Sequence, residues 1–380
     1  HELNRRLADD FAVHVICPHA PGAARFEVMD GVSIHRFRYA PENLESLVQD
    51  GGILANLKRS RWKWGLVPFF FLGLIIACWR CVREIEPHAI HAHWIFPQGL
   101  AIALLSVFSR SLPPFLITSH GGDLFGLRGR TFRLLKRWVL RRARAITVVS
   151  QPMVEVLVKL EVPLNEISVI PMGVDFSHRF SVDRGKQRIA GQILFVGRLV
   201  EKKGVKYLIE ALPVIRARVP GAHLVVVGGG PELGALAAQV CSLELRDCVE
   251  FRGPLPQCAL PELYQYASVF VAPFIDADSG DKEGLGLVTV EAIACGCPVV
   301  VGDVSVVADI FLDTEMEMRA IPGSPGSLAE KVTNVLLSPD EAVRRTAAIR
   351  ERLEQKMGWI SVANRYGELL RDVGGRAWSR

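Results

Sequence analysis

The sequence predicts an α/β protein with two Rossmann-like domains, each built on a doubly wound parallel sheet. Three observations support this prediction. Short apolar runs alternate with longer helical patterns throughout the 380 residues, as in repeated strand–helix units. The runs lack polar alternation, which is typical of strands buried on both faces of a parallel sheet. The length also fits two domains at about 100–200 residues each.

The apolar runs locate the expected strands. In the first half they are Phe11–Cys17, Val32–Phe37, Ala89–His93, Phe115–Ser119, Ala145–Val149 and Ser168–Ile170. In the second half they are Ile193–Val196, His223–Val227, Val249–Phe251, Val269–Ala272 and Pro298–Val301. The pattern lapses in the polar stretch 175–191, which we interpret as a linker between a first domain over 1–174 and a second over 192–350. The last segment, 351–380, belongs to an amphipathic helical stretch that could pack on either domain.

The charge of the chain is unevenly distributed. The formal net charge is +5, but the first 180 residues hold 22 Lys and Arg against 15 Asp and Glu, whereas the rest hold 23 against 25. A basic excess in one half indicates either an anionic partner, such as lipid headgroups or phosphates, or a solvated basic face. The eight cysteines show no zinc spacing beyond one C-x-x-C pair, so we expect reduced thiols and a cytosolic compartment.

Two segments of the first half are candidates for contact with a membrane. Trp64–Trp79 is sixteen nearly unbroken apolar residues with basic flanks, but it is shorter than the ~20 residues of a membrane span and Pro68 interrupts it. It is either a buried core helix or an interfacial segment. Arg128–Arg144 holds eight basic residues and no acid. Its helical pattern has an arginine stripe at 130, 133, 137, 141 and 144, and an opposite apolar face of Phe132, Leu135, Val139 and Ala143.

A basic turn opens the second half. The strand at Ile193–Val196 runs into Gly197-Arg198-Leu199-Val200-Glu201-Lys202-Lys203-Gly204 and then a helix. Ligands of open α/β sheets bind at the carboxyl ends of the strands. Arg198 and Lys203 could hold a diphosphate there and stabilise it as a leaving group. Alone this motif is weak, because a lysine before a helix is usually solvated, and we expect Lys203 to be exposed.

A second candidate site is the segment from Glu283 to Glu291. Seven residues separate the two glutamates, and glycines at 284 and 286 leave backbone amides at a helix start. A carboxylate at Glu291 suits a ribose diol, because it accepts from both hydroxyls. Glu283 could accept from sugar hydroxyls in the same way.

Histidines follow two strands of the first half. Thr118-Ser119-His120-Gly121-Gly122-Asp123 stands at the end of one strand, and the two glycines favour a ligand-binding role for His120. His91 and His93 are two positions apart on the preceding strand and point the same way. No further metal ligand is evident near them, so packing or acceptor contact is expected.

Together these motifs resemble glycosyltransferase family 4, which has the GT-B fold. The resemblance covers nearly the whole chain and is carried by HAHWIFPQG at 91–99, TSHGGD at 118–123, VIPMGVD at 169–175, FVGRLVEKKG at 195–204, VGGGPE at 227–232 and EGLGLVTVEAIACGCPVV at 283–300. It implies two Rossmann-like domains that face each other across a cleft, with the C-terminal helix crossing back to the first domain.

The resemblance also implies site residues. Arg198 and Lys203 correspond to the pair that binds the donor diphosphate, and Glu291 to the ribose-binding glutamate. The donor sugar would be engaged by Glu283 and by the backbone of Gly284, Leu285, Gly286 and Leu287. His120 corresponds to a histidine near the reacting centre, and Asp123 is expected close to it.

The implied activity is retaining transfer of a sugar from a nucleotide-diphosphate sugar to a saccharide or lipid-linked acceptor. We expect a role in cell-surface polysaccharide or glycolipid synthesis, at the cytoplasmic face of an anionic membrane, with no nucleic-acid partner. No cofactor or metal is expected, and the D-x-D of Asp276 and Asp278 is interpreted as a decoy. A nucleotide-sugar epimerase and a non-catalytic sugar-nucleotide-binding subunit remain alternatives, whereas the missing G-x-G-x-x-G disfavours a nicotinamide-dependent oxidoreductase.

The start of the chain carries one more expectation. Residues 1–9 read as the end of a helix that precedes the first strand. A parallel crossover needs a strand at each end, so we expect the natural protein to extend upstream by roughly 15–30 residues that hold a strand and a Gly-rich turn.

Overall fold

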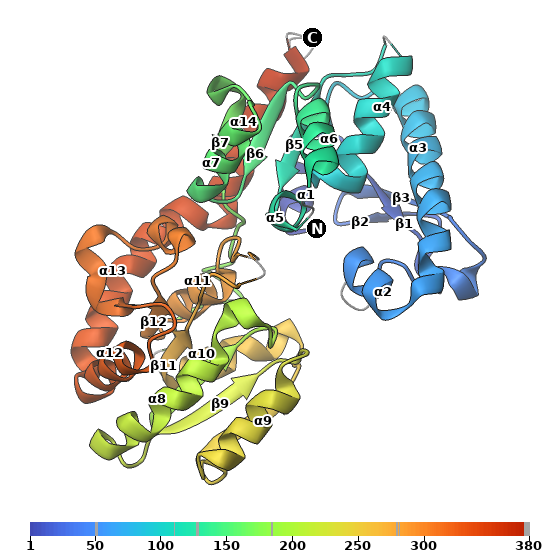
Figure 1. Ribbon diagram of the computed structural model, residues 1–380. Helices are drawn as coiled ribbons and strands as arrows, with labels where there is room; N and C mark the ends of the chain where they lie inside the picture. Colours follow the sequence, from blue (N-terminus) through green and yellow to red (C-terminus); the bar gives the residue numbers. More distant parts are fainter. Residues whose placement is uncertain are drawn as a thin grey trace. The chain divides into compact units, whose positions relative to one another are not determined.

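The computed structural model describes residues 1–49, 52–109, 111–126, 129–183, 185–278, 280 and 282–375. The chain forms two compact units, which Figure 1 shows in sequence colours. The first unit comprises His1–Val149, Met153–Ile170 and the chain from Ala363 onward. The second comprises Ser150–Pro152 and Pro171–Val362. The division therefore falls at residue 170, four residues before the expected boundary, and the C-terminal residues that pack with the first unit begin at 363.

The first unit holds two separate sheets. One has the order β1-β3-β2, formed by β1 (His14–Pro18), β2 (Phe26–Met29) and β3 (Val32–Phe37). The other has the order β4-β5-β6-β7 and is parallel throughout, with β4 (Ile90–His93), β5 (Phe115–Ser119), β6 (Ala145–Val148) and β7 (Ile167–Val169). Both β1 and β4 are edge strands of their sheets.

The strand β2 is an element that the sequence analysis missed. It pairs antiparallel with β3 through a turn at Asp30 and Gly31, whose φ angles of 49° and 77° are both positive. An Asp-Gly pair is a strong signal for a two-residue hairpin. The signal is present in the sequence, but the outer strand exposes Phe26 and Val28 and so lacks the pattern of a buried strand.

Eight helices belong wholly or mainly to the first unit among the described residues. They are α1 (Glu2–Leu7), α2 (Ile53–Arg59), α3 (Leu66–Ile85), α4 (Leu100–Phe108), α5 (Gly122–Phe125), α6 (Arg130–Leu140), α7 (Gln151–Lys159) and α14 (Trp359–Gly374). The C-terminal helix α14 is tied to this unit by Tyr366, which packs on His91, and by an ion pair of Arg371 with Asp10.

Helix α3 is longer than the sequence analysis expects. It runs unbroken over 20 residues, and Pro68 does not interrupt it. Pro68 is the third residue of the helix, where its missing N–H would have no intrahelical partner in any case. The segment Arg61–Ile85 is long and apolar enough to cross a membrane by length and composition alone, and 22 % of its apolar window is buried.

Helix α6 presents different faces from those expected. Val139 and Ala143 are buried as predicted, but Phe132 is 41 % exposed and Lys136 is buried. The Lys136 ammonium donates to the carbonyl of Leu124, which is how a cation is accommodated on the packed face. Within the arginine stripe, Arg137 pairs with Glu161. Arg128 lies outside the described residues.

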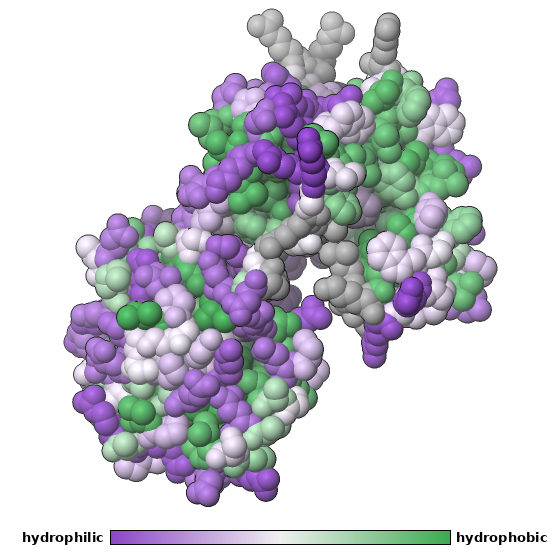
Figure 2. Space-filling view, viewed as in Figure 1, coloured by the Kyte–Doolittle hydropathy of each residue, from purple (hydrophilic) through white to green (hydrophobic). Residues whose placement is uncertain are grey.

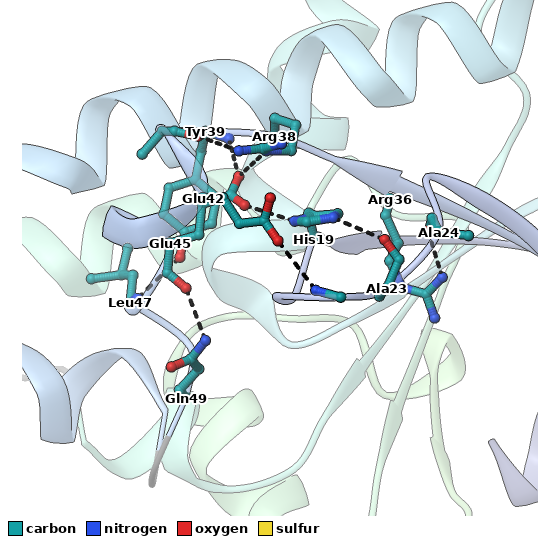
Figure 3. A network of polar contacts seen from close by, with 12 residues as sticks. His19, Ala23, Ala24, Arg36, Arg38, Tyr39, Glu42, Glu45, Leu47 and Gln49 are labelled. Carbon is teal, nitrogen blue, oxygen red and sulfur yellow. Dashed lines mark hydrogen bonds and ion pairs between the residues drawn. The ribbon is translucent and has the colours of Figure 1, made fainter.

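A buried polar network holds the turn that follows β1 (Figure 3). The His19 ring donates from Nδ1 to a Glu45 oxygen at 2.8 Å, and its Nε2 lies 3.0 Å from the Ala23 carbonyl oxygen. Glu45 is 1 % exposed and also accepts from Arg38 Nε and from the Tyr39 amide. Burial by itself would raise the pKa of Glu45, but these hydrogen bonds hold it below its ordinary value.

The second unit has one parallel sheet of the order β10-β9-β8-β11-β12-β13. Its strands are β8 (Ile189–Val196), β9 (His223–Val227), β10 (Val249–Gly253), β11 (Ala267–Ala272), β12 (Val299–Gly302) and β13 (Arg319–Ala320). Its main helices are α8 (Val205–Arg218), α9 (Leu233–Ser242), α10 (Leu260–Tyr266), α11 (Leu287–Ala294), α12 (Pro325–Leu337) and α13 (Pro339–Met357). This is a doubly wound order, because successive strands are added in one direction from β8 to β10 and in the opposite direction from β11 to β13. In such sheets ligands bind beyond the carboxyl ends of the two strands at the switch point, here β8 and β11.

The predicted linker is packed against the second unit. Phe176 and Phe180 are buried, and the Arg188 guanidinium donates to the carbonyls of Ala267 and Gly296. Strand β8 begins at Ile189, inside the range assigned to the linker. Part of the polar composition of 175–191 therefore reflects side chains that bind backbone groups, such as Arg188 on these carbonyls and Asp175 on the His178 amide.

Candidate active site

The basic turn of the second unit lies at the switch point of its sheet. It joins the end of β8 to α8, and Gly204 precedes the helix with a φ of 64°. A Cβ at Gly204 would lie 2.0 Å from the Pro273 carbonyl oxygen after β11, so only glycine lets the two segments approach this closely. The turn after β8 and the loop after β11 therefore meet at one edge of the sheet.

Lys203 is held in this site by a carboxylate. Its Nζ lies 3.0 Å from Glu283 Oε2, and the two side chains are only 12 % and 13 % exposed. The expectation of an exposed Lys203 is therefore wrong, because the loop after β11 covers it. The ammonium also lies 4.8 Å from the centre of the Phe274 ring, a cation–π contact. Arg198, the other predicted cation of the turn, is exposed.

Glu283 is kept ionised by this contact. Burial would raise its pKa, but the charge and hydrogen bond of Lys203 outweigh burial and lower the pKa below its ordinary value. Its other oxygen accepts from the Gly286 amide at 3.3 Å. A bound sugar hydroxyl would thus meet a carboxylate rather than a carboxylic acid.

Glu291 lies in a different electrostatic environment. It is the fifth residue of α11, 7 % exposed, and burial raises its pKa to about 7. Tyr264 donates to one of its oxygens at 3.3 Å, and Gln257 donates to the other at 3.4 Å. Both bonds are long, so the carboxyl group retains the capacity to accept hydrogen bonds from a ligand.

Tyr264 and Gln257 are site residues that sequence reasoning missed. Tyr264 is fully buried on α10, and Gln257 is fixed by Arg179, which donates to its Oε1 at 2.9 Å. Neither residue stands in a motif with Glu291, from which Gln257 is 34 positions distant. Their proximity depends on how α10 and α11 pack against the sheet.

The backbone between the glutamates forms the start of α11. Gly284, Leu285 and Gly286 precede the first helical residue, Leu287, and Gly286 has a φ of 71°. The first amides of a helix have no intrahelical acceptors. The amides at the start of α11 therefore lie beyond the carboxyl ends of the strands, as Lys203 and Glu283 do. There they suit an anionic or hydroxyl ligand.

The D-x-D segment does not form a metal cluster with its described neighbours. Asp276 is paired with Lys282 at 2.6 Å, and the backbone amide of Asp278 donates to Glu201. Across the part of the chain that the structure describes, no group of three His, Cys, Asp or Glu residues has the arrangement of a metal site.

His120 of the first unit directly follows β5 and belongs to a cluster of aromatic rings. Its Nε2 lies 3.0 Å from His93 Nδ1, and the two rings are stacked with centroids 5.3 Å apart. The Trp94 ring also contacts His120, with centroids 5.2 Å apart and a tilted geometry. Burial lowers the pKa of His120 although Asp123 acts in the opposite direction, and burial lowers the pKa of His93 to about 4.

Asp123 is placed to fix the turn that carries His120. It is 4 % exposed, and its two oxygens accept from Ser119 Oγ at 2.8 Å and from the Ile95 amide at 2.6 Å. These bonds link the ends of β5 and β4. The carboxylate is thereby engaged within the first unit.

His91 belongs to a deeper polar chain. Its Nε2 lies 2.6 Å from Thr118 Oγ1, which contacts Thr147 Oγ1 at 2.5 Å. The hydroxyl of Tyr366 on α14 lies 3.4 Å from both threonines. Of the two histidines on β4, only His93 therefore bonds directly to His120.

Comparison with known proteins identifies both units. Residues 1–178 match the model of Glycosyltransferase Family 4, and residues 180–352 match that of Glycosyl transferases group 1. A GDP-mannose-dependent alpha-(1-6)-phosphatidylinositol monomannoside mannosyltransferase of Mycobacterium tuberculosis is 31 % identical over 308 residues, covering 77 % of this chain and 78 % of that protein. A glycogen synthase of the same organism is 29 % identical over 287 residues, covering 74 % of this chain and 68 % of that protein.

Solved structures agree on the fold. A sucrose-phosphate synthase from Thermosynechococcus elongatus aligns with a TM-score of 0.77 at 20 % identity, covering 98 % of this chain and 91 % of that one. Anabaena HepE in complex with UDP aligns with a TM-score of 0.67 at 18 % identity, covering 90 % and 86 %. The chain belongs to glycosyltransferase family 4, and it is a GT-B glycosyltransferase that acts on sugar nucleotides.

Proposed function

We propose that the protein is a retaining hexosyltransferase that uses a nucleoside-diphosphate hexose and a saccharide or lipid-linked acceptor in cell-surface polysaccharide or glycolipid synthesis. The observation that carries the proposal is the Lys203–Glu283 pair at the switch point of the second sheet. A cation and a carboxylate side by side match a donor that presents a diphosphate next to sugar hydroxyls. The relative that uses GDP-mannose supports GDP-mannose as the first donor to test.

Donor binding rearranges the charges of the site. A diphosphate brings about two negative charges that Arg198 and Lys203 can neutralise. Lys203 then shares its hydrogen bonds with phosphate, and Glu283 becomes free to accept from sugar hydroxyls. Glu291 accepts from the ribose diol, and the amides of 284–287 take remaining sugar or phosphate oxygens.

In the chemical step, the glycosyl phosphate bond of the donor is replaced by a glycosidic bond to the acceptor. The bond from the anomeric carbon to the diphosphate oxygen breaks, and the acceptor oxygen bonds to that carbon on the same face. The acceptor hydroxyl gives its proton to the departing phosphate, so the residues mainly stabilise charge and fix orientation. No metal is required in this proposal, since Arg198 and Lys203 supply the positive charge. His120 is the proposed contribution of the first unit to the reacting sugar, and Asp123 positions its turn.

We also propose that the first unit binds the surface of an anionic membrane through α3. One stripe of this helix packs inward, whereas Phe69, Leu72, Ile76 and Trp79 are 40–61 % exposed. The end of α4 adds Phe108, which is 85 % exposed. Figure 2 shows hydrophobic residues gathered over the part of the first unit that holds α3 and α4. Soluble surfaces rarely expose such a contiguous apolar area.

The residues around the α3 face favour a lipid surface as its occupant. Trp62 and Trp64 are exposed just before the helix, and tryptophan prefers the membrane–water interface. Arg59 and Arg61 precede the apolar stretch, and Arg80 and Arg83 lie toward its end. Basic residues beside an apolar helix face attract anionic headgroups while the apolar side chains enter the boundary of the bilayer. We propose on this basis that the enzyme acts at the cytoplasmic face of the membrane.

Thermal-shift measurements with GDP-mannose, UDP-glucose and ADP-glucose test which nucleotide sugar binds as the donor. A ligand at a hundred times its dissociation constant adds about 2.7 kcal/mol to the stability of the unit that binds it. Stabilisation by one of these donors, followed by sugar transfer that requires an acceptor, is the expected result. Conversion of the donor without an acceptor would replace the proposal with an epimerase. Binding without any transfer to lipid or saccharide acceptors would replace it with a non-catalytic subunit.

A further inference from the structure

The contact between His93 and His120 links two residues that lie 27 positions apart, at the ends of neighbouring parallel strands. A distance of 3.0 Å between Nδ1 of His93 and Nε2 of His120 is a hydrogen bond, so one of the two nitrogens carries the proton. Burial lowers the pKa of both rings, so both are neutral above pH 7. Each ring therefore has one N–H and one bare nitrogen.

The shared proton couples the tautomers of the two rings. If His120 donates from Nε2, then His93 Nδ1 is bare and both rings are Nε2–H tautomers. If His93 donates from Nδ1, then both rings are Nδ1–H tautomers. The Nε2–H form is the more stable tautomer of an isolated neutral histidine, so the pair favours the first arrangement. The hydrogen bond made by one ring nitrogen sets the role of the other.

We propose that His93 is a positioning residue that holds His120 as its Nε2–H tautomer, so that Nδ1 of His120 is a hydrogen-bond acceptor for a substrate hydroxyl. The last clause rests on the proposed function, whereas the tautomer assignment rests on the hydrogen bond between His93 and His120 and on the intrinsic preference of neutral histidine for the Nε2–H form. The stacked ring of His93 and the tilted ring of Trp94 also restrict the rotation of the His120 ring. His120 then orients a hydroxyl and does not protonate the leaving group.

Long-range ¹H–¹⁵N correlation spectra of the ¹⁵N-labelled chain at pH 7.5 test the assignment without a substrate. Bare and protonated ring nitrogens have well-separated ¹⁵N shifts, and the His120 signals are identified by their loss in His120→Gln. We expect a single Nε2–H form of His120 in the wild-type chain. His93→Leu should convert it to a mixture of tautomers. His93→Asn should restore the single form, because the amide oxygen can accept where Nδ1 did.

His91→Leu is the matched control. His91 lies on the same strand and its ring is 4.1 Å from that of His93, but its hydrogen bond goes to Thr118. The control should leave the tautomer of His120 unchanged. An Nδ1–H form of His120 in the wild-type chain overturns the proposal, and so does an equal effect of His91→Leu and His93→Leu. The wild-type spectrum and the Asn variant decide the question if His93→Leu does not fold.

Kinetics with GDP-mannose separate this inference from the proposed function. His93→Leu should lower kcat about tenfold, equivalent to ~1.4 kcal/mol, and leave the affinity for GDP unchanged, because the predicted diphosphate and ribose contacts are in the second unit. His93→Asn should recover most of the loss. An equal loss in the control, or a loss in GDP affinity alone, contradicts the positioning role. Absence of transfer by the wild-type chain contradicts the proposed donor and leaves the spectroscopic result to decide on His93.

Discussion

The ammonium nitrogen of Lys203 lies 3.0 Å from a carboxylate oxygen of Glu283, although 79 residues separate them in the chain. Without a donor, each group neutralises the other in a nearly buried setting. The pair therefore holds a cation and an anion side by side, and under the proposed function a donor engages each of them.

Replacing Lys203 should affect both stability and turnover. Lys203→Met leaves Glu283 buried without its cation, which costs about 3–5 kcal/mol when one partner of a buried pair is removed. Loss of a charge that stabilises the leaving group should also lower turnover by ~10²–10³. Thermal unfolding and transfer assays measure the two effects. The double variant Lys203→Met/Glu283→Gln should regain stability but not turnover.

The stability loss in Lys203→Met should depend on pH. The pKa of Glu283 is lowered in the folded chain, so its stabilisation is present above the unfolded value and is lost as pH falls through the folded pKa. In Lys203→Met the buried carboxyl has lost its cation and takes up a proton at a higher pH than in the wild type. The stability difference between the two proteins should therefore shrink as pH falls from 7, and further as it falls below about 4.5. If Lys203→Met alone left stability and turnover unchanged at pH 7, Lys203 would not belong to the donor site.

Donor affinity should rise with pH through the titration of Glu291. Its pKa is about 7, so the carboxylate form that accepts from a ribose diol increases about tenfold between pH 6 and pH 8. Calorimetric titration with GDP-mannose or UDP-glucose should show a gain of that order, since their diphosphates do not titrate in this range. Glu291→Gln should bind weakly at both values. It should also be more stable than wild type above pH 7, because the raised pKa makes ionisation of Glu291 unfavourable to folding. A pH-independent affinity in the wild type would argue against the ribose contact.

Removal of the charge on Glu45 should loosen the sheet β1-β3-β2. Glu45→Gln leaves His19 and Arg38 without the anion that both contact, and we expect a loss of about 3–5 kcal/mol. Hydrogen exchange of the β1 and β3 amides reports this locally, without an assumption about the second unit. Glu42→Gln is the control, because Glu42 is exposed and, among the described residues, accepts from the Gly22 amide outside the buried network. If the β1 and β3 amides were equally protected from hydrogen exchange in the two variants, the network would contribute little to the stability of this sheet.

A charge on the outer face of α3 should weaken membrane binding. Leu72→Glu removes a side chain that is 54 % exposed, and loss of its insertion costs about 1.5–3 kcal/mol, or at least tenfold in partition. Val214→Glu is the matched control, since Val214 is 55 % exposed on α8 of the second unit. Sedimentation with phosphatidylglycerol vesicles in low and high salt measures the effect. Equal partition of the wild type onto neutral and anionic vesicles would contradict the role of the basic flanks.

Transfer should persist in EDTA. Arg198 and Lys203 provide positive charge at the proposed diphosphate site, and Asp276 is engaged by Lys282. Activity is therefore expected to be equal with and without the chelator. Loss of activity that Mg²⁺ or Mn²⁺ restores would assign a metal role to Asp276 and Asp278.

Much of the second unit was predictable because its signals are local. A run such as His223–Val227 is apolar without alternation, which indicates a strand with both faces buried. The positions of Arg198, Lys203 and Glu283 in turns that follow strands were predictable, and so was the position of Glu291 in the next helix. Their roles at a donor site stay predictions. The glycines around these residues also indicate where backbone segments approach closely. A Cβ at Gly204 would prevent the turn after β8 from meeting the loop after β11.

Several features of the first unit depended on packing. The Asp-Gly turn before β3 was a local signal for a hairpin, but its outer strand is exposed and lacks the expected apolar run. Proline usually breaks a helix, yet Pro68 stands in the first turn of α3 and is accommodated there. The faces of α6 differed because Lys136 reaches a backbone carbonyl from the buried side.

The sequence by itself determined where most strands and helices lie and which turns carry charge, because periodicity and turn chemistry act over a few neighbouring residues. The tertiary structure decided that Lys203 meets Glu283, that Tyr264 and Gln257 contact Glu291, and that His93 bonds to His120. Each of these contacts joins residues on different elements. Their distances follow from strand order and from the packing of helices on the sheet, and so do the burial and pKa of each group, because desolvation and charge proximity depend on three-dimensional neighbours.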